Sequence, residues 1–286
     1  MTPEQIAHER SRGRLAAVVA IVAAALFVAA GIWSSSLGAD VPERNGPAEL
    51  RYFDRHHGEL IASWTLRGLA LLLLLAVTLH LTRALKARRP DEPQVVMVMG
   101  VFGPIAAGIG TIAAGIALAQ AATSFADRQF QTIDAANDAI RVASLIGLPS
   151  VAGFLALAFW FVKGCLDAMR IGLLGRIVGI TGIAMGPGLV LASGVFQFLL
   201  PAWLLAVGAI FAGPPLRGLP PAWKAGKAVP MPSARERFGE ALDEGIRTTP
   251  NGEVEAVGPG VRKPDAADGA AAARPRRRKR KRRGPR

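Results

Sequence analysis

One charged side chain lies deep inside an apolar stretch of this sequence. Arg67 stands about seven residues, or ~10 Å of helix, inside the edge of a stretch near 60–82. Charges at such depth usually mark a function, so Arg67 with the amides of Gln120 and Gln197 forms a candidate outward-facing site for an anionic ligand. The alternative is structural: the guanidinium reaches the headgroups or pairs with an acid of a neighbouring loop. These acids are Asp127, Asp134 and Asp138.

Two adjacent histidines offer metal-binding side chains. His56 and His57 stand near Asp54 and Glu59, and these residue types bind zinc. Adjacent side chains point in different directions on a helix or a strand, and no second group of ligands has metal spacing. The sequence therefore predicts no metal site and no cofactor.

Catalytic motifs are missing as well. The sequence contains no G-x-S-x-G, no P-loop, no H-E-x-x-H and a single cysteine, Cys165. This pattern argues against an enzyme.

Six apolar stretches must position these residues. Each is close to the length that a helix needs to cross about 30 Å of hydrocarbon, and each is apolar on all sides, which is typical of helices in lipid. No Asp or Glu falls within them. We place them near 15–33, 60–82, 95–123, 142–162, 171–192 and 196–213. The expected fold is an all-α, six-span transmembrane bundle (1–213).

Three of these stretches need further comment. The first is nineteen residues long, which exceeds the about 7–15 apolar residues of a signal peptide, so we expect an uncleaved helix. The last two cover residues 171–213, of which 177–213 carry no charge, and they require a tight hairpin near Ser193 and Gly194.

The density of Lys and Arg alternates between successive loops, and this pattern sets the orientation. Basic residues collect on the cytoplasmic side of membrane proteins. Lys and Arg number three in 1–14, three against five acids in 34–59, four in 83–94, two against three acids in 124–141, three in 163–176 and eighteen after 213. Both termini are therefore predicted to be cytoplasmic.

Aromatic and basic residues near the ends of the stretches are consistent with this threading. Tryptophan is enriched at membrane interfaces, so we expect Trp33, Trp64 and Trp203 at the outer interface and Trp160 and Trp223 at the inner one. By the same reasoning His80 and Arg83, where the second stretch leaves the membrane, are expected to contact headgroups.

Glycines recur at helical spacing in the third and fifth stretches. Small residues let membrane helices approach closely. Such faces serve packing within the bundle or the formation of a homo-oligomer. The glycines are Gly103, Gly108, Gly110 and Gly115, and then Gly175, Gly179, Gly182 and Gly186.

The composition changes after Gly213. Residues 214–247 form a juxtamembrane segment in which Ser233 and Glu236 have capping-box spacing. They predict a short amphipathic helix over about 234–247. Residues 248–273 are rich in Gly, Ala and Pro, a composition that predicts a disordered linker.

The last thirteen residues carry ten of the thirteen net positive charges. They are expected to be disordered, and three interpretations stay open: binding to anionic lipid headgroups, binding to nucleic acid, or a topological signal. The tail has no aromatic residue on which bases stack, which argues against nucleic acid. Its basic residues are Arg274, Arg276, Arg277, Arg278, Lys279, Arg280, Lys281, Arg282, Arg283 and Arg286.

Two segments of the sequence resemble a known group of proteins. They are AMRIGLLGRIVGITGIAMG, which begins at Ala168, and GLPPAWKAGKA, which begins at Gly218. With the basic end they resemble a family of multi-pass membrane proteins of high-GC Gram-positive bacteria that has no assigned activity. The resemblance implies a bacterial plasma-membrane location and transfers no functional residue.

These observations predict an integral membrane protein with an interaction or membrane-organising role, whose tail lies on the anionic inner leaflet. The alternative is a transporter or a small-molecule-binding protein with an outer site at Arg67. The sequence does not identify a small-molecule ligand.

Overall fold

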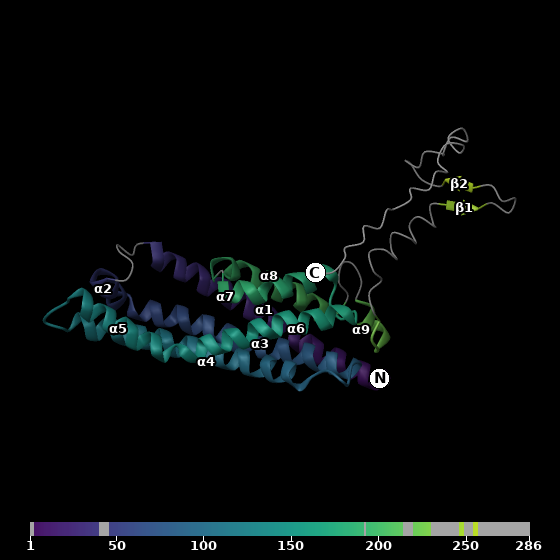
Figure 1. Cartoon of the computed structure of the whole chain (residues 1–286), viewed down its shortest axis with the longest axis horizontal. Coiled ribbons are helices and arrows are strands. Elements are labelled where there is room, and N and C mark those ends of the chain that lie inside the picture. Colours follow the sequence, from purple (N-terminus) through teal and green to yellow (C-terminus); the bar gives the residue numbers. More distant parts are fainter. Residues whose placement is uncertain are drawn as a thin grey trace, which may run out of the picture. The chain divides into compact units, whose positions relative to one another are not determined.

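The computed structural model describes residues 3–39, 46–191, 193–213, 220–229, 246–248 and 254–256. They form nine helices and two short strands (Figure 1). The helices are α1 (Pro3–Ala39), α2 (Pro47–Arg55), α3 (His57–Arg88), α4 (Gln94–Ala126), α5 (Ile133–Ile146), α6 (Leu148–Arg170), α7 (Arg176–Leu191), α8 (Ser193–Ala212) and α9 (Pro221–Ala225).

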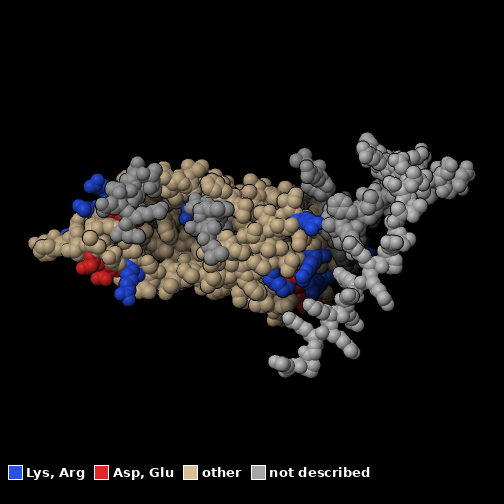
Figure 2. Space-filling view, turned by 45° about the horizontal axis from the view of Figure 1, so that its top comes forward, with Lys and Arg blue, Asp and Glu red and all other residues tan. Residues whose placement is uncertain are grey.

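Four helices are long and apolar enough to cross a membrane, and two apolar helices are shorter. In Figure 2 the middle of the visible face is almost entirely uncharged, while Lys, Arg, Asp and Glu gather toward its two ends. These features confirm an all-α, multi-pass membrane protein. The four long segments are Ser11–Leu37, His57–Arg88, Gln94–Ala126 and Leu148–Arg170, and the two shorter ones are Arg176–Val190 and Phe198–Ala212.

The six apolar helices form a closed ring. In order around the ring, α1 packs on α3, α3 on α4, α4 on α6, α6 on α7, α7 on α8, and α8 returns to α1. Helices α3 and α6 also touch across the ring. Because neighbouring helices bury their side chains against each other, the centre of the ring is filled.

Aromatic side chains occupy this centre. Trp160 and Trp203 are 0% and 1% exposed, and Phe161 packs edge-on against both rings. The Trp160 and Trp203 ring centroids lie 6.5 Å apart, so the prediction that one lies at the outer interface and the other at the inner interface is wrong. Each indole N–H finds a partner inside the bundle instead, at 3.0 Å from Thr82 Oγ1 for Trp160 and 3.1 Å from the Val178 carbonyl for Trp203. A satisfied indole has no need of the headgroup region.

Glycines bring α4 and α6 into backbone contact. A Cβ added to Gly110 would overlap the backbone of Ser150, and one added to Gly153 would overlap the backbone of Ala107. On α7, Gly182 packs against Cys165 of α6. Several glycines that the sequence analysis identified as contact faces are thus used within one copy of the chain.

Helices α6 and α7 do not match the predicted spans 142–162 and 171–192. Helix α6 covers Leu148–Arg170 rather than 142–162, and α5 precedes it with a break at Gly147. Hydropathy alone predicts that the span ends before Lys163, because lysine is charged. Helix α6 continues past this residue because Asp167 and Glu92 compensate the lysine charge. Helix α7 then begins at Arg176 rather than 171.

The α7–α8 connection and the C-terminal segment are described only in part. Helix α7 ends at Leu191 and α8 begins at Ser193, close to the predicted hairpin near Ser193 and Gly194. Strands β1 (Ile246–Thr248) and β2 (Val254–Ala256) pair antiparallel within a separate unit, Pro232–Arg286. Most of the predicted helix 234–247 and linker 248–273, and all of the basic tail, lie outside the described residues.

Candidate functional site

One end of the bundle is rich in Lys and Arg, and we call it the basic end. It is where α1, α4 and α7 begin and where α3, α6 and α8 end. Among the residues whose side chains the structure describes, this end has ten Lys or Arg and five acidic residues. The opposite end has four Lys or Arg and six acidic residues. The basic end is therefore the positively charged side of the bundle.

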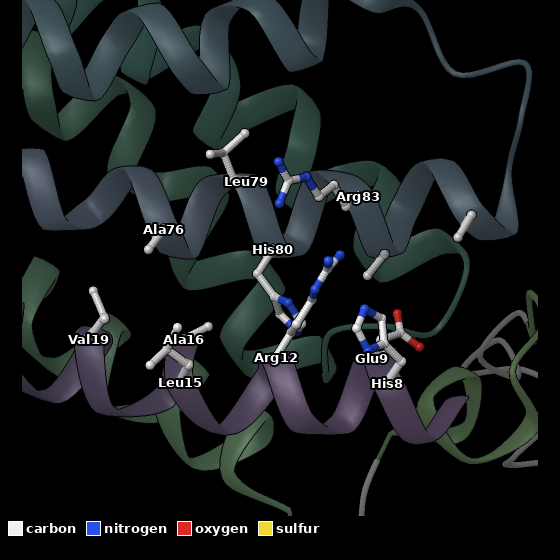
Figure 3. Close-up of a pocket in the computed structure, with 12 residues that line it drawn as sticks. His8, Glu9, Arg12, Leu15, Ala16, Val19, Ala76, Leu79, His80 and Arg83 are labelled. Carbon is white, nitrogen blue, oxygen red and sulfur yellow. The ribbon is translucent and has the colours of Figure 1, made fainter. Parts of the chain in front are cut away.

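A groove of about 740 Å³ lies between α1 and α3 at the basic end (Figure 3). Arg12 of α1 and His80 of α3 reach toward each other across the gap, with His8 beside them. Further along the two helices the lining becomes apolar, and its larger side chains are Leu15, Val19 and Leu79. The groove thus combines a basic end with an apolar wall.

The one acid in the groove is already neutralised. Glu9 accepts two hydrogen bonds from Arg88, at 2.7 Å from Nη1 and 2.9 Å from Nη2. Arg12 and Arg83, also in the lining, are exposed and have no ion-pair partner among the described residues. Two arginines are therefore left to face an anion.

The chain segment that follows α8 packs against His80, one of the residues that line the groove. Trp223 of α9 stacks on the His80 ring with centroids 5.7 Å apart, and its indole N–H donates to the Leu173 carbonyl at 2.8 Å. Farther along, the Val229 N–H donates to the Ile171 carbonyl at 3.1 Å. We call residues 220–229 the strap, because they run across the basic end and hold it together.

Gly172 permits this contact of the strap. Its φ is +76°, a conformation that side chains rarely adopt, and a Cβ there would overlap the Val229 carbonyl.

A cluster of ion pairs lies at the end of α6, just before the α6–α7 connection that the strap contacts. The side chains of Asp167 and Glu92 are 0% and 3% exposed, and Lys163 pairs with both. Arg89 lies 3.5 Å from each of the two acids, and Arg170 lies 3.8 Å from Asp167. Buried charges of this kind are tolerated only when paired, so the cluster fixes the short α3–α4 connection against α6.

No family model matches this chain, and no curated protein or solved structure matches it either. Any functional role must therefore be argued from the residues themselves.

The structure does not bring the predicted outer-site residues into one cavity among those described. Arg67 lies on α3 and donates to Ser34 of α1 at 3.4 Å. Gln120 of α4 lines two small cavities at the opposite end of the bundle, and Arg67 lines neither. Gln197 lies in α8, but its side chain is outside the described ones.

The two adjacent histidines both contact backbone carbonyls in the last turn of α2. His56 Nδ1 lies 3.0 Å from the Tyr52 carbonyl, and His57 Nδ1 lies 3.0 Å from the Asp54 carbonyl. Within the described residues no group of three or more metal-binding side chains is found.

Sequence reasoning missed the most buried charges of the basic end. The predicted span 142–162 ends before Asp167, and the sequence predicts no contact between Glu9 and Arg88. The spacing of Lys163 and Asp167, four residues apart, is a pair signal on a helix and would have indicated a longer α6. The Glu9–Arg88 pair has no local signal, because it joins residues 79 positions apart.

Proposed function

We propose that this chain is a six-span plasma-membrane protein with both termini in the cytoplasm, and that its basic end and tail bind anionic headgroups of the inner leaflet. Its role is non-enzymatic: it organises lipids or partner proteins around the bundle. The tail residues that would contact headgroups are those from Arg274 to Arg283.

The ring of helices supports six spans. The two shorter helices, α7 and α8, pack as neighbours and close the ring between α6 and α1, so they share the environment of the four long helices. The positive-inside rule then orients the basic end toward the cytoplasm.

The burial of acids at the basic end is the observation that carries the proposed lipid binding. Glu9, Glu92 and Asp167 have side chains at most 12% exposed, and each is ion-paired. Exposed cations such as Arg12, Arg83 and Lys86 are not balanced in this way. The surface facing the headgroups is therefore more positive than the residue count indicates, and each basic residue near an anionic surface contributes about 1 kcal/mol.

Deleting residues 274–286 is expected to reduce the enrichment of anionic lipid around the protein. The deletion removes ten basic residues, and their attraction to the surface is electrostatic. The measurement compares the full chain with the chain ending at Ala273 in nanodiscs that contain equal amounts of phosphatidylglycerol and phosphatidylcholine. Lipid retained after detergent extraction is then quantified at low and high salt. Equal retention by both proteins at low salt would contradict the role of the tail.

An outer ligand site at Arg67 is a second candidate, favoured by one observation. The Nε of Arg67 is buried and has no hydrogen-bond partner among the described residues, although its Nη2 donates to Ser34, and a charged group at membrane depth is a candidate ligand contact. Arg67→Leu is expected to abolish retention of a small anion that co-purifies with the full chain, measured by mass spectrometry of the extracted ligand. Unchanged anion content would exclude this site, and Arg128→Leu serves as the control.

A further inference from the structure

We infer that the groove between α1 and α3 is a discrete binding site for one anionic phospholipid, with the phosphate at Arg12 and Arg83 and an acyl chain along the apolar wall. The inference rests on the proposed membrane orientation. It goes further, because it places a specific lipid on the bundle rather than a diffuse layer under the tail.

The charges of the groove select an anion. Arg12 and Arg83 come from facing helices and are not paired with any acid in the described part of the chain. Three arginines and one acid lie close enough to His80 to affect it electrostatically: Arg12, Arg83, Arg88 and Glu9. Glu9 is ion-paired with Arg88. Guanidinium groups bind phosphate through paired hydrogen bonds, so a phosphate matches this end of the groove better than a neutral headgroup.

The apolar wall selects a lipid over a free phosphate. From Arg12 to Val19 the groove continues for seven residues, or about 10 Å of helix, in the direction of the bundle centre. One leaflet of hydrocarbon is about 15 Å thick, so an acyl chain attached to a phosphate at Arg12 runs along this wall. Leu15 is 71% exposed, and in a membrane an exposed leucine next to an exposed arginine meets both parts of a phospholipid.

The His80 ring, which lines the groove, is packed between two aromatic side chains. His80 is held between Trp223, which stacks on it, and Phe211, which meets it edge-on with centroids 4.6 Å apart. Its Nε2 is buried and has no hydrogen-bond partner among the described residues, and native structures rarely leave such an atom unpaired without a reason. The volume of about 740 Å³ also lies within the range of ligand sites.

Basic pockets between membrane helices on the cytoplasmic side are known sites for phosphate-bearing lipid headgroups. The groove has each part of such a site: two helices, two arginines without an ion pair in the described part of the chain, and a lipid-facing apolar wall. A second copy of this chain would have to present an acidic helix, whereas the described helix ends at this level are basic. The occupant that the charges fit is therefore the surrounding inner-leaflet lipid.

The test is native mass spectrometry of the full chain, released from detergent and titrated with phosphatidylglycerol. The R12Q/R83Q double variant removes the two groove arginines. The matched control, R14Q/K86Q, removes two exposed basic residues from the same helices, and neither of them lines the groove. The first phosphatidylglycerol adduct is expected to bind roughly tenfold more weakly, or worse, to R12Q/R83Q, while the control changes less than about threefold.

Two further arms identify the source of the phosphate. Phosphatidylcholine is expected to give no adduct of comparable strength, and glycerol phosphate is expected not to displace phosphatidylglycerol. Equal weakening of both double variants would overturn the inference, because general charge would then explain the binding. Displacement by glycerol phosphate would also overturn it.

The nanodisc enrichment described above separates this inference from the proposed function. If deleting residues 274–286 left lipid enrichment unchanged while R12Q/R83Q weakened the first adduct, only the role of the tail would be rejected. If the deletion reduced enrichment while R12Q/R83Q bound the first phosphatidylglycerol as tightly as the full chain, only the groove would be rejected.

Discussion

Gly153→Ala is expected to destabilise the bundle by about 3 kcal/mol, at the upper end of what overpacking usually costs. The added methyl would overlap the backbone nitrogen of Ala107 and lie 2.7 Å from its Cα. Backbone atoms in the middle of α4 have no alternative rotamer, so relief requires α4 and α6 to move apart.

The contact is part of a longer antiparallel register. Gly110 faces Ser150, Ala107 faces Gly153, and Gly103 faces Leu157. Separating the helices at Gly153 would therefore loosen neighbouring contacts in both directions, and in lipid close packing is what holds helices together.

The measurement is thermal unfolding of the purified chain in one detergent, followed by tryptophan fluorescence. Gly188→Ala on α7 is the matched control, because nothing lies within 4 Å of its added Cβ and alanine favours a helix over glycine. The Gly153 variant should melt well below the wild type and the control should not. Equal melting temperatures for the two variants would show that α4 and α6 are not in backbone contact.

The sequence predicted the membrane helices well because lipid imposes a simple rule. A helix in hydrocarbon must be apolar for its whole crossing, so the approximate positions of α1, α3 and α4 could be read from hydropathy. The rule is less accurate at helix ends, where a charge is tolerated if it is paired. Asp167 is the example: its three cationic partners let α6 extend past the predicted end.

The sequence predicted only the α3 side of the candidate groove. His80 and Arg83 were expected to contact headgroups from their place on one helix. Their association with His8 and Arg12 depends on α1 packing against α3, and this pairing of helices leaves no local pattern. The same limit explains the error at Trp160, since its hydrogen bond to Thr82 joins residues 78 positions apart.

Arg88→Met is expected to cost about 3–5 kcal/mol of stability, the usual effect of breaking a buried ion pair. The Arg88 side chain is 0% exposed, and its loss leaves the Glu9 carboxylate, 12% exposed, without its partner. Arg88 also donates to the Ala222 carbonyl at 3.2 Å and lies over the Trp223 ring at 5.0 Å. One side chain therefore joins α1, α3 and the strap.

A double-mutant cycle with Glu9→Gln separates the ion pair from the rest. Removing the carboxylate as well relieves the uncompensated charge, so the Glu9→Gln/Arg88→Met chain should be more stable than Arg88→Met alone. Recovery should be incomplete, because the strap still lacks its contacts to the guanidinium. Arg88→Lys should also fail to restore stability, since an ammonium does not offer the paired donors that Glu9 accepts.

The readout is again thermal unfolding in detergent, with Lys86→Met as the control, since Lys86 is exposed and has no ion pair among the described residues. If Arg88→Met and Lys86→Met melted at the same temperature, the guanidinium would not be buried against Glu9. A double variant no more stable than Arg88→Met would place the cost in the strap contacts instead. Equal melting of Arg88→Met and Lys86→Met would mean that Arg88 does not neutralise Glu9. Glu9 could then pair with Arg12 or Arg83, so this cycle also tests the electrostatic basis of the lipid groove.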